Sequence, residues 1–438
     1  MAHGPRAHYG SRQCDARKGE LNPLTLPEHS SRRDFLGAVG AMSAAVAISP
    51  RPWARSLDSI TQPSPTAATP RGLAASDDFL FDPGLVYLQT GSLGPTPRPV
   101  MDRTIAAWHE LERNPVVHGY GDLEHALDDV RAKCAAFLGC AADEVVLTSC
   151  TTDGMNRTAL GLGLSAGDRV LTTDQEHPGG RSCWDFLART RGLVIDEVKI
   201  VPGEHDAAAI VERFARAITL RTKVLSFSHV LSSTGLRMPV AELSALARAH
   251  ACVSVVDGAQ AVGGIAVNVK QLGCDVYATS GHKWLLAPKG TGLLYVNTSL
   301  GARLELITLQ LGHAAYTGAT GVTNIPGVLG LGAALEYANA RGIAAIEAHN
   351  LALRTRLDVA LATIPMLRIV SAREPALASP LLSYRLPDEI KALDLYQRLA
   401  DKHQVIVKVV PGNWFNGQRI STHLFNTEAD VDALVAAL

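Results

Sequence analysis

Short runs of β-branched and other apolar residues alternate with longer amphipathic segments from about Asp77 onward. Short continuous apolar runs are typical of strands buried on both faces, and the amphipathic segments between them are typical of covering helices. Helical spacing is clearest at Asp206–Leu220 and Val240–His250. The runs that fit a strand are Glu144–Thr148, Arg169–Thr173, Leu193–Ile200, Lys223–Phe227 and Cys252–Val256. The alternation predicts an α/β fold with a mainly parallel sheet flanked by helices.

The pattern changes after Gly327, where the chain becomes mostly helical and then contains a few short strand-like pieces. The clearest signals there are a helix over Ile343–Leu361, strands over Leu381–Arg385 and Gln404–Val409, and a last helix from Glu428. This order is typical of a smaller α+β domain. We therefore predict three parts: a leader and linker over residues 1–76, a large domain with an N-terminal arm over 77–330, and a small C-terminal domain over 331–438.

The first residues of the chain differ in composition from the rest. The arginine pair in Ser31–Leu36 (SRRDFL) precedes an apolar run, Gly37–Ile48, and then a stretch rich in proline, serine and threonine. This order resembles a twin-arginine (Tat) export signal with a flexible linker; the alternative is a disordered N-terminus with a chance arginine pair. The run is shorter than the about 20 residues that span a membrane, so no stable span is expected. We expect export by the Tat machinery to the periplasm or extracellular space, with Ala45–Ala47 as one candidate cleavage site.

Composition excludes some classes of partner and of metal site. The 438 residues carry a formal net charge of −1, so no excess charge favours binding to nucleic acid. The seven cysteines form no CxxC pair, and the sequence therefore predicts neither a metal site nor a disulfide framework. With 47% hydrophobic residues, the chain is long enough for a large and a smaller domain, each with its own core.

Two polar clusters that follow strand-like runs could carry chemistry. Asp257 comes directly after the run CVSVV; it could cap a helix, or it could be a carboxylate that keeps a pyridine nitrogen protonated. Lys283 follows Ser280 and His282 and precedes Trp284 and two leucines. A lysine in partly apolar surroundings has a lowered pKa and can attack an aldehyde as the neutral amine. The alternative for Lys283 is an ordinary surface lysine.

Together, the segments VDGAQAVGG and YATSGHKWLLAPKGTGLLYV resemble the class V aminotransferase family. This family belongs to the fold type I enzymes that depend on pyridoxal 5′-phosphate, and it includes cysteine desulfurases and isopenicillin N epimerase. The resemblance runs from about Val86 to the C-terminus. It implies the fold type I transferase architecture and a homodimer with active sites at the interface.

The resemblance implies a role for each residue of the two clusters. Lys283 would hold pyridoxal phosphate as a Schiff base and later move the proton at the substrate α-carbon. Asp257 would pair with the pyridine nitrogen, and Gln260 would donate to the phenolic oxygen of the cofactor. Ser280 and His282 would bind the phosphate.

A further match is Thr148–Asn156 (TSCTTDGMN), which resembles the turn that holds the phosphate in the family. Thr151 and Thr152 would contact the phosphate at a helix N-terminus, where free amides and the helix dipole favour an anion. The alternative is an ordinary capped helix start. This chain has Cys150 where the family usually has glycine.

Two other residues complete the implied site. His177, followed by Trp184 at the family's spacing, would stack on the cofactor ring and relay protons; the alternative is a loop histidine without function. Arg419, in RISTHLFNT, would bind the substrate carboxylate as a bidentate fork, unless it forms a structural salt bridge. In the family the partner subunit also contacts the phosphate, and here Thr320 and Thr323 are both candidates.

The sequence narrows the reaction without naming it. Cysteine desulfurases need a cysteine shortly before the carboxylate-binding arginine, but Lys408–Gly417 contains none, and no cysteine follows Cys274. The segment Ser228–Gly235 (SHVLSSTG) is closer to isopenicillin N epimerase-like proteins. We therefore expect abstraction of an α-proton and epimerisation of an amino acid or amino-acid-like substrate. Transamination and β-elimination of the C–S lyase type share the early steps and stay open.

Two readings from other classes also stay open. The glycines of Gly327–Gly332 could belong to a nucleotide-binding oxidoreductase, but they lack a preceding strand and a later acidic residue. The fold could also serve an exported binding protein without catalytic activity. The complete set of Asp257, His282, Lys283 and Arg419 favours an enzyme.

Overall fold

The structure is a computed structural model that describes residues 70–306 and 321–438. Nearly all of the predicted leader and linker lies outside the described residues, so export by the Tat route stays a prediction. Thr320 also lies outside the described residues, so its contact with the phosphate from the partner subunit stays a prediction. The described residues all belong to one compact unit. Within the described ranges, no helix is both long enough and apolar enough to cross a membrane.

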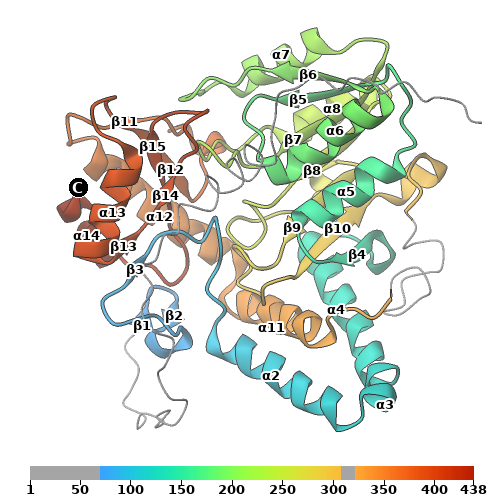
Figure 1. The fold of residues 1–438 in the computed structure, drawn as a ribbon, viewed down its shortest axis with the longest axis horizontal. Coiled ribbons are helices and arrows are strands. Elements are labelled where there is room, and N and C mark those ends of the chain that lie inside the picture. Colours follow the sequence, from blue (N-terminus) through green and yellow to red (C-terminus); the bar gives the residue numbers. More distant parts are fainter. Residues whose placement is uncertain (1–69, 307–320) are drawn as a thin grey trace, which may run out of the picture. The chain divides into compact units, whose positions relative to one another are not determined.

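A seven-stranded sheet forms the centre of this unit, in the order β4–β10–β9–β8–β7–β5–β6 (Figure 1). The strands are β4 Val145–Thr148, β5 Arg169–Thr173, β6 Val194–Val198, β7 Thr222–Ser228, β8 Val253–Asp257, β9 Val276–Ser280 and β10 Gly292–Val296. Strands β5 to β9 pair in parallel, whereas β10 runs antiparallel to both β4 and β9. The predicted mainly parallel sheet is confirmed.

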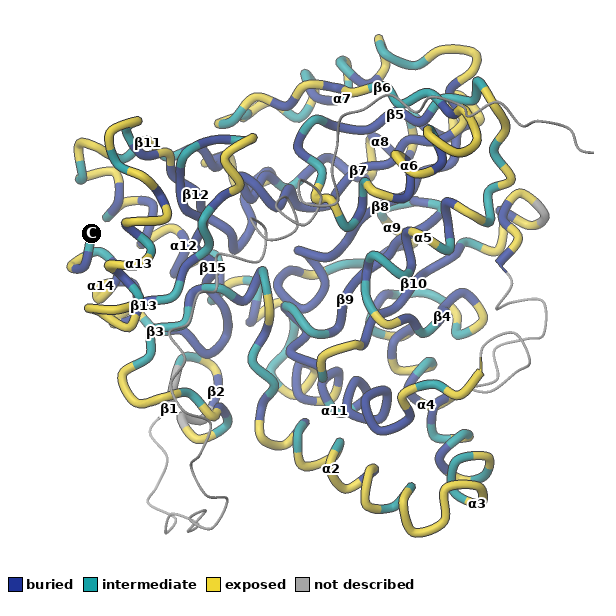
Figure 2. Tube along the Cα trace, in the orientation of Figure 1, coloured by how far each residue is buried: buried dark blue, intermediate teal, exposed yellow. Residues whose placement is uncertain are grey.

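Helices cover both faces of this sheet because successive apolar residues of each strand point to opposite sides. Val146 and Val255 pack with one set of helices, while Val145 and Val256 pack with the other. The first set is α5 Thr151–Gly161 and α6 Pro178–Arg191; the second includes α4 Asp122–Leu138, α7 Ala207–Ala217, α8 Val240–Ala249, the short α9 Val269–Leu272 and α11 Ile325–Arg341. The strands of this sheet other than the edge strand β6 are therefore mostly buried on both sides (Figure 2).

A second, four-stranded sheet has the order β11–β12–β15–β14 and only antiparallel pairs. Its strands are β11 Arg368–Ile369, β12 Leu381–Arg385, β14 Lys408–Val409 and β15 Gly417–Ser421. Helices α12 Ile343–Leu361, α13 Ala392–His403 and α14 Glu428–Ala437 share a hydrophobic core with this sheet. The two sheets and their helices match the predicted fold class.

The N-terminal arm connects to both the second sheet and the main sheet. After the short pair β1 Pro70–Arg71 and β2 Ala74–Ala75, strand β3 (Val86–Tyr87) pairs in parallel with β13 (Val405–Ile406). Gln89 then bridges to Ser421 at the end of β15. The arm continues into α2 Arg98–Arg113, which packs on α11, and into α3 Pro115–Gly119.

Several predicted elements match closely, and one is wrong. Arg169–Thr173, Ile343–Leu361 and Leu381–Arg385 are reproduced to the residue. The single strand predicted over Gln404–Val409 is instead two strands: β13 pairs with the arm and β14 pairs with β15. A continuous apolar run cannot reveal that its pairing partner changes midway. The predicted boundary at 330/331 falls inside α11, and the division into two domains stays a prediction.

Candidate active site

The predicted site residues gather where strands β8 and β9 end. Asp257 is the last residue of β8, and Ser280 is the last residue of its parallel neighbour β9. The loop after β9 carries His282 and Lys283. Because the carboxyl ends of parallel strands meet at one edge of a sheet, residues far apart in the sequence come together here.

An anion cradle lies at the N-terminus of α5. The Thr151 amide donates to Ser280 Oγ over 2.9 Å, and the two hydroxyl oxygens are 2.8 Å apart. His282 donates from Nδ1 to the Thr291 carbonyl over 3.2 Å, which leaves Nε2 for a ligand. Thr152 lies close by: a Cβ placed on Gly179 would be 2.6 Å from Thr152 Oγ1. Hydroxyls and a helix N-terminus are the donors that a phosphate requires.

The helix start itself is ordinary in one respect. Cys150 is the N-cap of α5, and its Sγ accepts from the Asp153 amide at 3.4 Å. The backbone of Cys150 is extended, with φ −173°. Every L-residue adopts that conformation, so the cysteine in place of glycine leaves the turn intact.

Asp257 is buried, with 6% of its surface exposed. Its Oδ1 accepts from the Ala259 amide over 2.9 Å, and no helix begins there, so the alternative of a helix cap is wrong. Oδ2 makes no hydrogen bond to the described residues, and a Cβ at Gly180 would lie 2.5 Å from it. Burial raises the pKa of Asp257, and the charge of Lys283 opposes that shift. A cationic partner at Oδ2 would keep the carboxylate ionised.

Lys283 is only partly exposed and forms no ion pair or hydrogen bond through Nζ among the described residues. Desolvation lowers the pKa of Lys283 to about 8, against the opposing attraction of Asp257. The arm holds the lysine backbone: the Gly94 amide donates to the His282 carbonyl over 2.8 Å. A Cβ at Gly94 would lie 2.0 Å from the Lys283 carbonyl oxygen. This is not the setting of a freely solvated surface lysine.

Gln260 ties the arm to the lysine loop. Its Nε2 donates to the Gly91 carbonyl over 2.7 Å, and its Oε1 accepts from Trp284 Nε1 over 2.9 Å. One N–H of the amide remains, and it is the group that could donate to a phenolic oxygen. At the next carbonyl of the chain, His423 Nε2 donates to the Trp284 oxygen over 2.7 Å, so the ring carries a proton on Nε2.

His177 caps α6 with its ring. Nδ1 accepts from the Gly179 amide over 3.0 Å, so the neutral ring carries its proton on Nε2. Desolvation and then the charge of Lys283 lower the pKa of His177 to about 4. Part of the residue nevertheless stays exposed, so the ring is available to a stacking partner.

Arg419 is a buried guanidinium without an acidic partner. It is 2% exposed and donates from Nη1 to the Ser232 carbonyl over 2.8 Å and from Nη2 to Ser92 Oγ over 3.2 Å. Nε is buried and has no hydrogen-bond partner. Burial lowers the pKa of Arg419 to about 10. No acidic residue of the described chain pairs with Arg419, so the alternative of a structural salt bridge is wrong. The free donors suit a carboxylate.

Three residues of this region were not predicted from the sequence as site residues. Ser92 reaches Arg419 from the arm, and Glu176 lies beside His177 with a carboxyl that accepts from Thr173 Oγ1 over 2.7 Å and Ser228 Oγ over 2.6 Å. Lys408 of β14 stands directly opposite Arg419 of β15. Only Lys408 carried a signal in the sequence, as a lysine inside the apolar run VIVKVV.

Comparison with known proteins identifies relatives along most of the chain. The model of the family "Aminotransferase class-V" matches residues 86–434. Isopenicillin N epimerase of Amycolatopsis lactamdurans is 31% identical over 387 residues, covering 83% of this chain and 97% of the relative. A cysteine desulfurase of Serratia proteamaculans (strain 568) is 30% identical over 389 residues, covering 81% and 92%.

The fold also matches a solved structure. The cystine C–S lyase C-DES, in complex with its product cysteine persulfide, superposes with a TM-score of 0.72 over 81% of this chain and 97% of that chain. At 22% identity, this likeness concerns the fold alone.

The carboxyl group of Glu176 provides a test of this electrostatic arrangement that does not depend on activity. Desolvation raises the pKa of Glu176 from 4.5 to about 7, and the nearby charge of Asp257 adds to that effect. Between these pH values the folded protein holds a proton that the unfolded chain has lost, so this group's contribution to stability declines as pH rises.

We expect Glu176→Gln, which resembles the protonated carboxyl, to remove part of the pH dependence of stability. Between about pH 5 and about pH 8, the wild-type Tm should fall more than that of the variant. Glu242→Gln, at an exposed position on α8, is the matched control and should follow the wild type. Parallel Tm profiles for Glu176→Gln and wild type would show that the carboxyl is not perturbed.

Proposed function

Since the chain belongs to the class V aminotransferase family, whose enzymes depend on pyridoxal 5′-phosphate, we propose that it epimerises an amino acid or amino-acid-like substrate at the α-carbon. The reaction would resemble that of isopenicillin N epimerase, to which the chain is 31% identical. The enzyme class and the cofactor follow from the family. The particular reaction is the proposal.

The residues at the carboxyl edge of the main sheet fit this cofactor. The groups that would hold it are Thr151, Thr152, Ser280 and His282 at the phosphate, Asp257 at the pyridine nitrogen, Gln260 at the phenolic oxygen, and His177 against the ring. The hydroxyl pair of Thr151 and Ser280 and the unbonded Oδ2 of Asp257 support this placement. When bound, pyridoxal phosphate supplies an electron sink for the charge that develops at the α-carbon.

The unpaired guanidinium of Arg419 is the observation that carries the proposal. A buried cation without an acid is costly unless a ligand supplies the anion. An α-carboxylate supplies it and would be oriented by the planar fork. Arg419 lies close enough to Lys283 for its positive charge to help lower the pKa of the lysine. An amino acid held at Arg419 would present its α-carbon to Lys283.

Proton transfer is the chemistry that these side chains can perform. A lysine with a pKa of about 8 has an accessible neutral form, so Lys283 can accept the α-proton at Nζ. The centre inverts when a proton returns to the opposite face of the α-carbon. His177 carries its proton on Nε2 and would relay protons beside the ring. Persulfide formation would need a thiol, and none occurs in Lys408–Gly417.

Transamination and C–S bond elimination are the alternative reactions. Both would use Lys283 for the same first proton transfer, so the residues of the site serve all three reactions. Single-turnover spectroscopy against L- and D-amino acids, with product analysis, separates the reactions. Inversion supports the proposal, whereas keto acid or released thiol selects an alternative. Absence of turnover with every amino acid would favour a binding protein without activity.

We expect Lys283→Ala to lose the visible absorption of the covalently bound cofactor, because the variant lacks the amine that forms the covalent link. The wild type should be yellow, and borohydride should abolish its visible band. Lys289→Ala is the control, since this lysine instead donates to Gly94 and Thr96. A borohydride-sensitive band in Lys283→Ala would contradict the assignment.

For Arg419→Ala we expect the KM of amino acids with a free α-carboxylate to rise by tenfold or more, as about 1.5–3 kcal/mol is typical for a hydrogen bond to a charged group. In the wild type, substrates that carry an α-amide in place of the α-carboxylate should have a higher KM than the parent amino acids. In Arg419→Ala this difference should disappear. Arg419→Lys keeps the charge but not the fork and should lie between. An unchanged KM in the alanine variant would argue that Arg419 is structural only.

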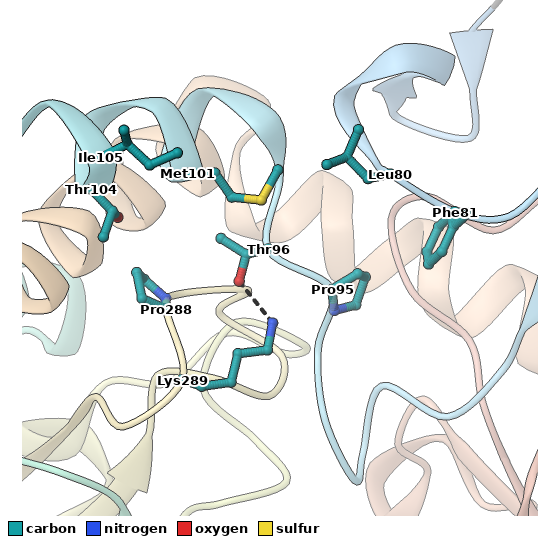
Figure 3. A pocket seen from close by; sticks show the side chains of 9 residues that line it. All are labelled: Leu80, Phe81, Pro95, Thr96, Met101, Thr104, Ile105, Pro288 and Lys289. Carbon is teal, nitrogen blue, oxygen red and sulfur yellow. Dashed lines mark hydrogen bonds between the residues drawn. The ribbon is translucent and has the colours of Figure 1, made fainter. Parts of the chain in front are cut away.

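The exposed apolar residues of the arm, α2 and α3 support a homodimer. A groove about 500 Å³ in volume lies between the arm and α2, lined by Leu80, Phe81, Pro95, Thr96, Met101, Thr104, Ile105, Pro288 and Lys289 (Figure 3). Further along this segment Trp108, Val116 and Val117 are also exposed. Clustered apolar surface of this kind marks an interface. Thr323 is partly exposed and stays a candidate for the contact between subunits.

We expect Ile105→Glu to shift the protein from dimer to monomer in light scattering, because it places a charge in the apolar interface. Ile105 is 52% exposed in the single chain. Leu220→Glu is the control, since Leu220 is 100% exposed and lies outside this segment. Equal masses for wild type and Ile105→Glu would count against a dimer built on α2.

A further inference from the structure

A second cation, Lys408, stands beside the proposed carboxylate clamp. Lys408 of β14 and Arg419 of β15 are paired in register, and Ser383 of β12 pairs with Arg419 from the other side. Directly opposed residues of an antiparallel pair project from the same face, with Cβ atoms about 4.5–5.5 Å apart. The side chains of Lys408 and Arg419 therefore point to the same side of the small sheet.

That side is the active site and not the core of the small sheet. Val407, next to Lys408 in the chain, is buried in the core that the sheet forms with α12, α13 and α14, and Val409 packs against it. Ser383 hydrogen-bonds the Ser233 carbonyl, and Arg419 hydrogen-bonds the Ser232 carbonyl, so this face meets the loop after β7. Lys408 is half-buried there.

Neither cation has an anionic partner among the residues that the structure describes. No ion pair of the described residues includes Lys408 or Arg419, and no acidic side chain offsets the effect of burial on the pKa of either cation. The acids elsewhere in the site are Asp257 and Glu176. Asp257 faces Lys283, and Glu176 is held by Thr173 and Ser228. Burial, followed by the charge of Arg419, lowers the pKa of Lys408. Like charges directly opposite each other on two strands are destabilising unless an anion lies between or beside them.

We propose that Lys408 binds a second carboxylate of the substrate, so that the site selects amino acids or amino-acid-like molecules whose side chain carries an acidic group. This inference rests on the proposed function, because it assigns the α-carboxylate to Arg419. Nη1 of Arg419 donates to both the carbonyl and the hydroxyl of Ser232, and Nη2 donates once, to Ser92. Nε and the second hydrogen of Nη2 are left, and together they form a fork for one carboxylate. The ammonium of Lys408 is then left for another anion.

The test compares dicarboxylates with a monocarboxylate as simple probes. Isothermal titration calorimetry measures the Kd of succinate, glutarate and adipate, which differ in the spacing of their carboxylates, and of butyrate as the reference. At least one dicarboxylate should bind wild-type protein about tenfold more tightly than butyrate, the gain typical of one further charged hydrogen bond. No preference for any dicarboxylate in the wild type would overturn the proposal.

The variants separate the two cations. Lys408→Met should lose most of the dicarboxylate preference and leave butyrate binding within about twofold. Lys408→Arg should retain the preference, and Lys402→Met, which removes an exposed lysine of α13, should match the wild type. Equal weakening of butyrate and dicarboxylates by Lys408→Met would show that both cations hold one carboxylate and would overturn the proposal. Unchanged binding of both would overturn it as well.

A second arm uses turnover and distinguishes this inference from the proposed function. In Lys408→Met, KM should rise for glutamate or aspartate but not for glutamine or asparagine, whichever pair the enzyme accepts. Equal KM effects within the pair contradict the inference while the enzyme class stands. If the wild type shows no cofactor absorption band, the proposed function is contradicted. The calorimetric test of Lys408 would still decide the inference. A Tm equal to wild type establishes that the variant is folded.

Discussion

The burial of Arg419 is the constraint around which the active site is arranged. A guanidinium that is 2% exposed must replace its water with other partners, and the protein supplies only neutral ones. They come from the loop after β7, through the Ser232 carbonyl, and from the N-terminal arm, through Ser92. The small sheet, the main sheet and the arm must therefore meet at one point before the charge is even partly compensated. A carboxylate completes the set that the protein leaves unfinished.

The arm can reach this point only because two of its residues are glycines, which have no side chain. A Cβ on Gly91 would lie 2.9 Å from Gln260 Oε1 and 3.0 Å from Arg419 Nη2. At Gly94 it would be 2.0 Å from the Lys283 carbonyl oxygen, a contact that no side chain tolerates. The arm thus lies directly against both the lysine loop and the arginine, and Gln260 fixes it by its bond to the Gly91 carbonyl. The position of Lys283 therefore depends on the position of the arm.

The sequence allowed much of this to be predicted, since local signals and proximity in the chain agree for the main sheet. Asp257 at the end of an apolar run and Lys283 after the next strand are local features, and both lie at the edge where such sheets bind ligands. The contacts of Ser92 and Gly91 could not be predicted from the sequence, because their partners lie about 330 positions later in the chain. The bond from the Gly91 amide to Ser421 is an example. The run VIVKVV was misinterpreted for another physical reason: its residues pair with the arm first and with β15 afterwards.

That change of pairing partner also decides what the site can do. Lys283 and Asp257 serve every reaction that begins with removal of an α-proton, so they cannot select among epimerisation, transamination and elimination. The stretch that begins with β14 and ends before Arg419 bears on a further reaction, the formation of a persulfide. A thiol there could attack a substrate sulfur, but this chain places a lysine beside Arg419 and has no cysteine in the stretch. A protonated lysine attracts anions and does not act as a nucleophile. The selectivity of this site should therefore arise from binding an acidic group and not from a second covalent step.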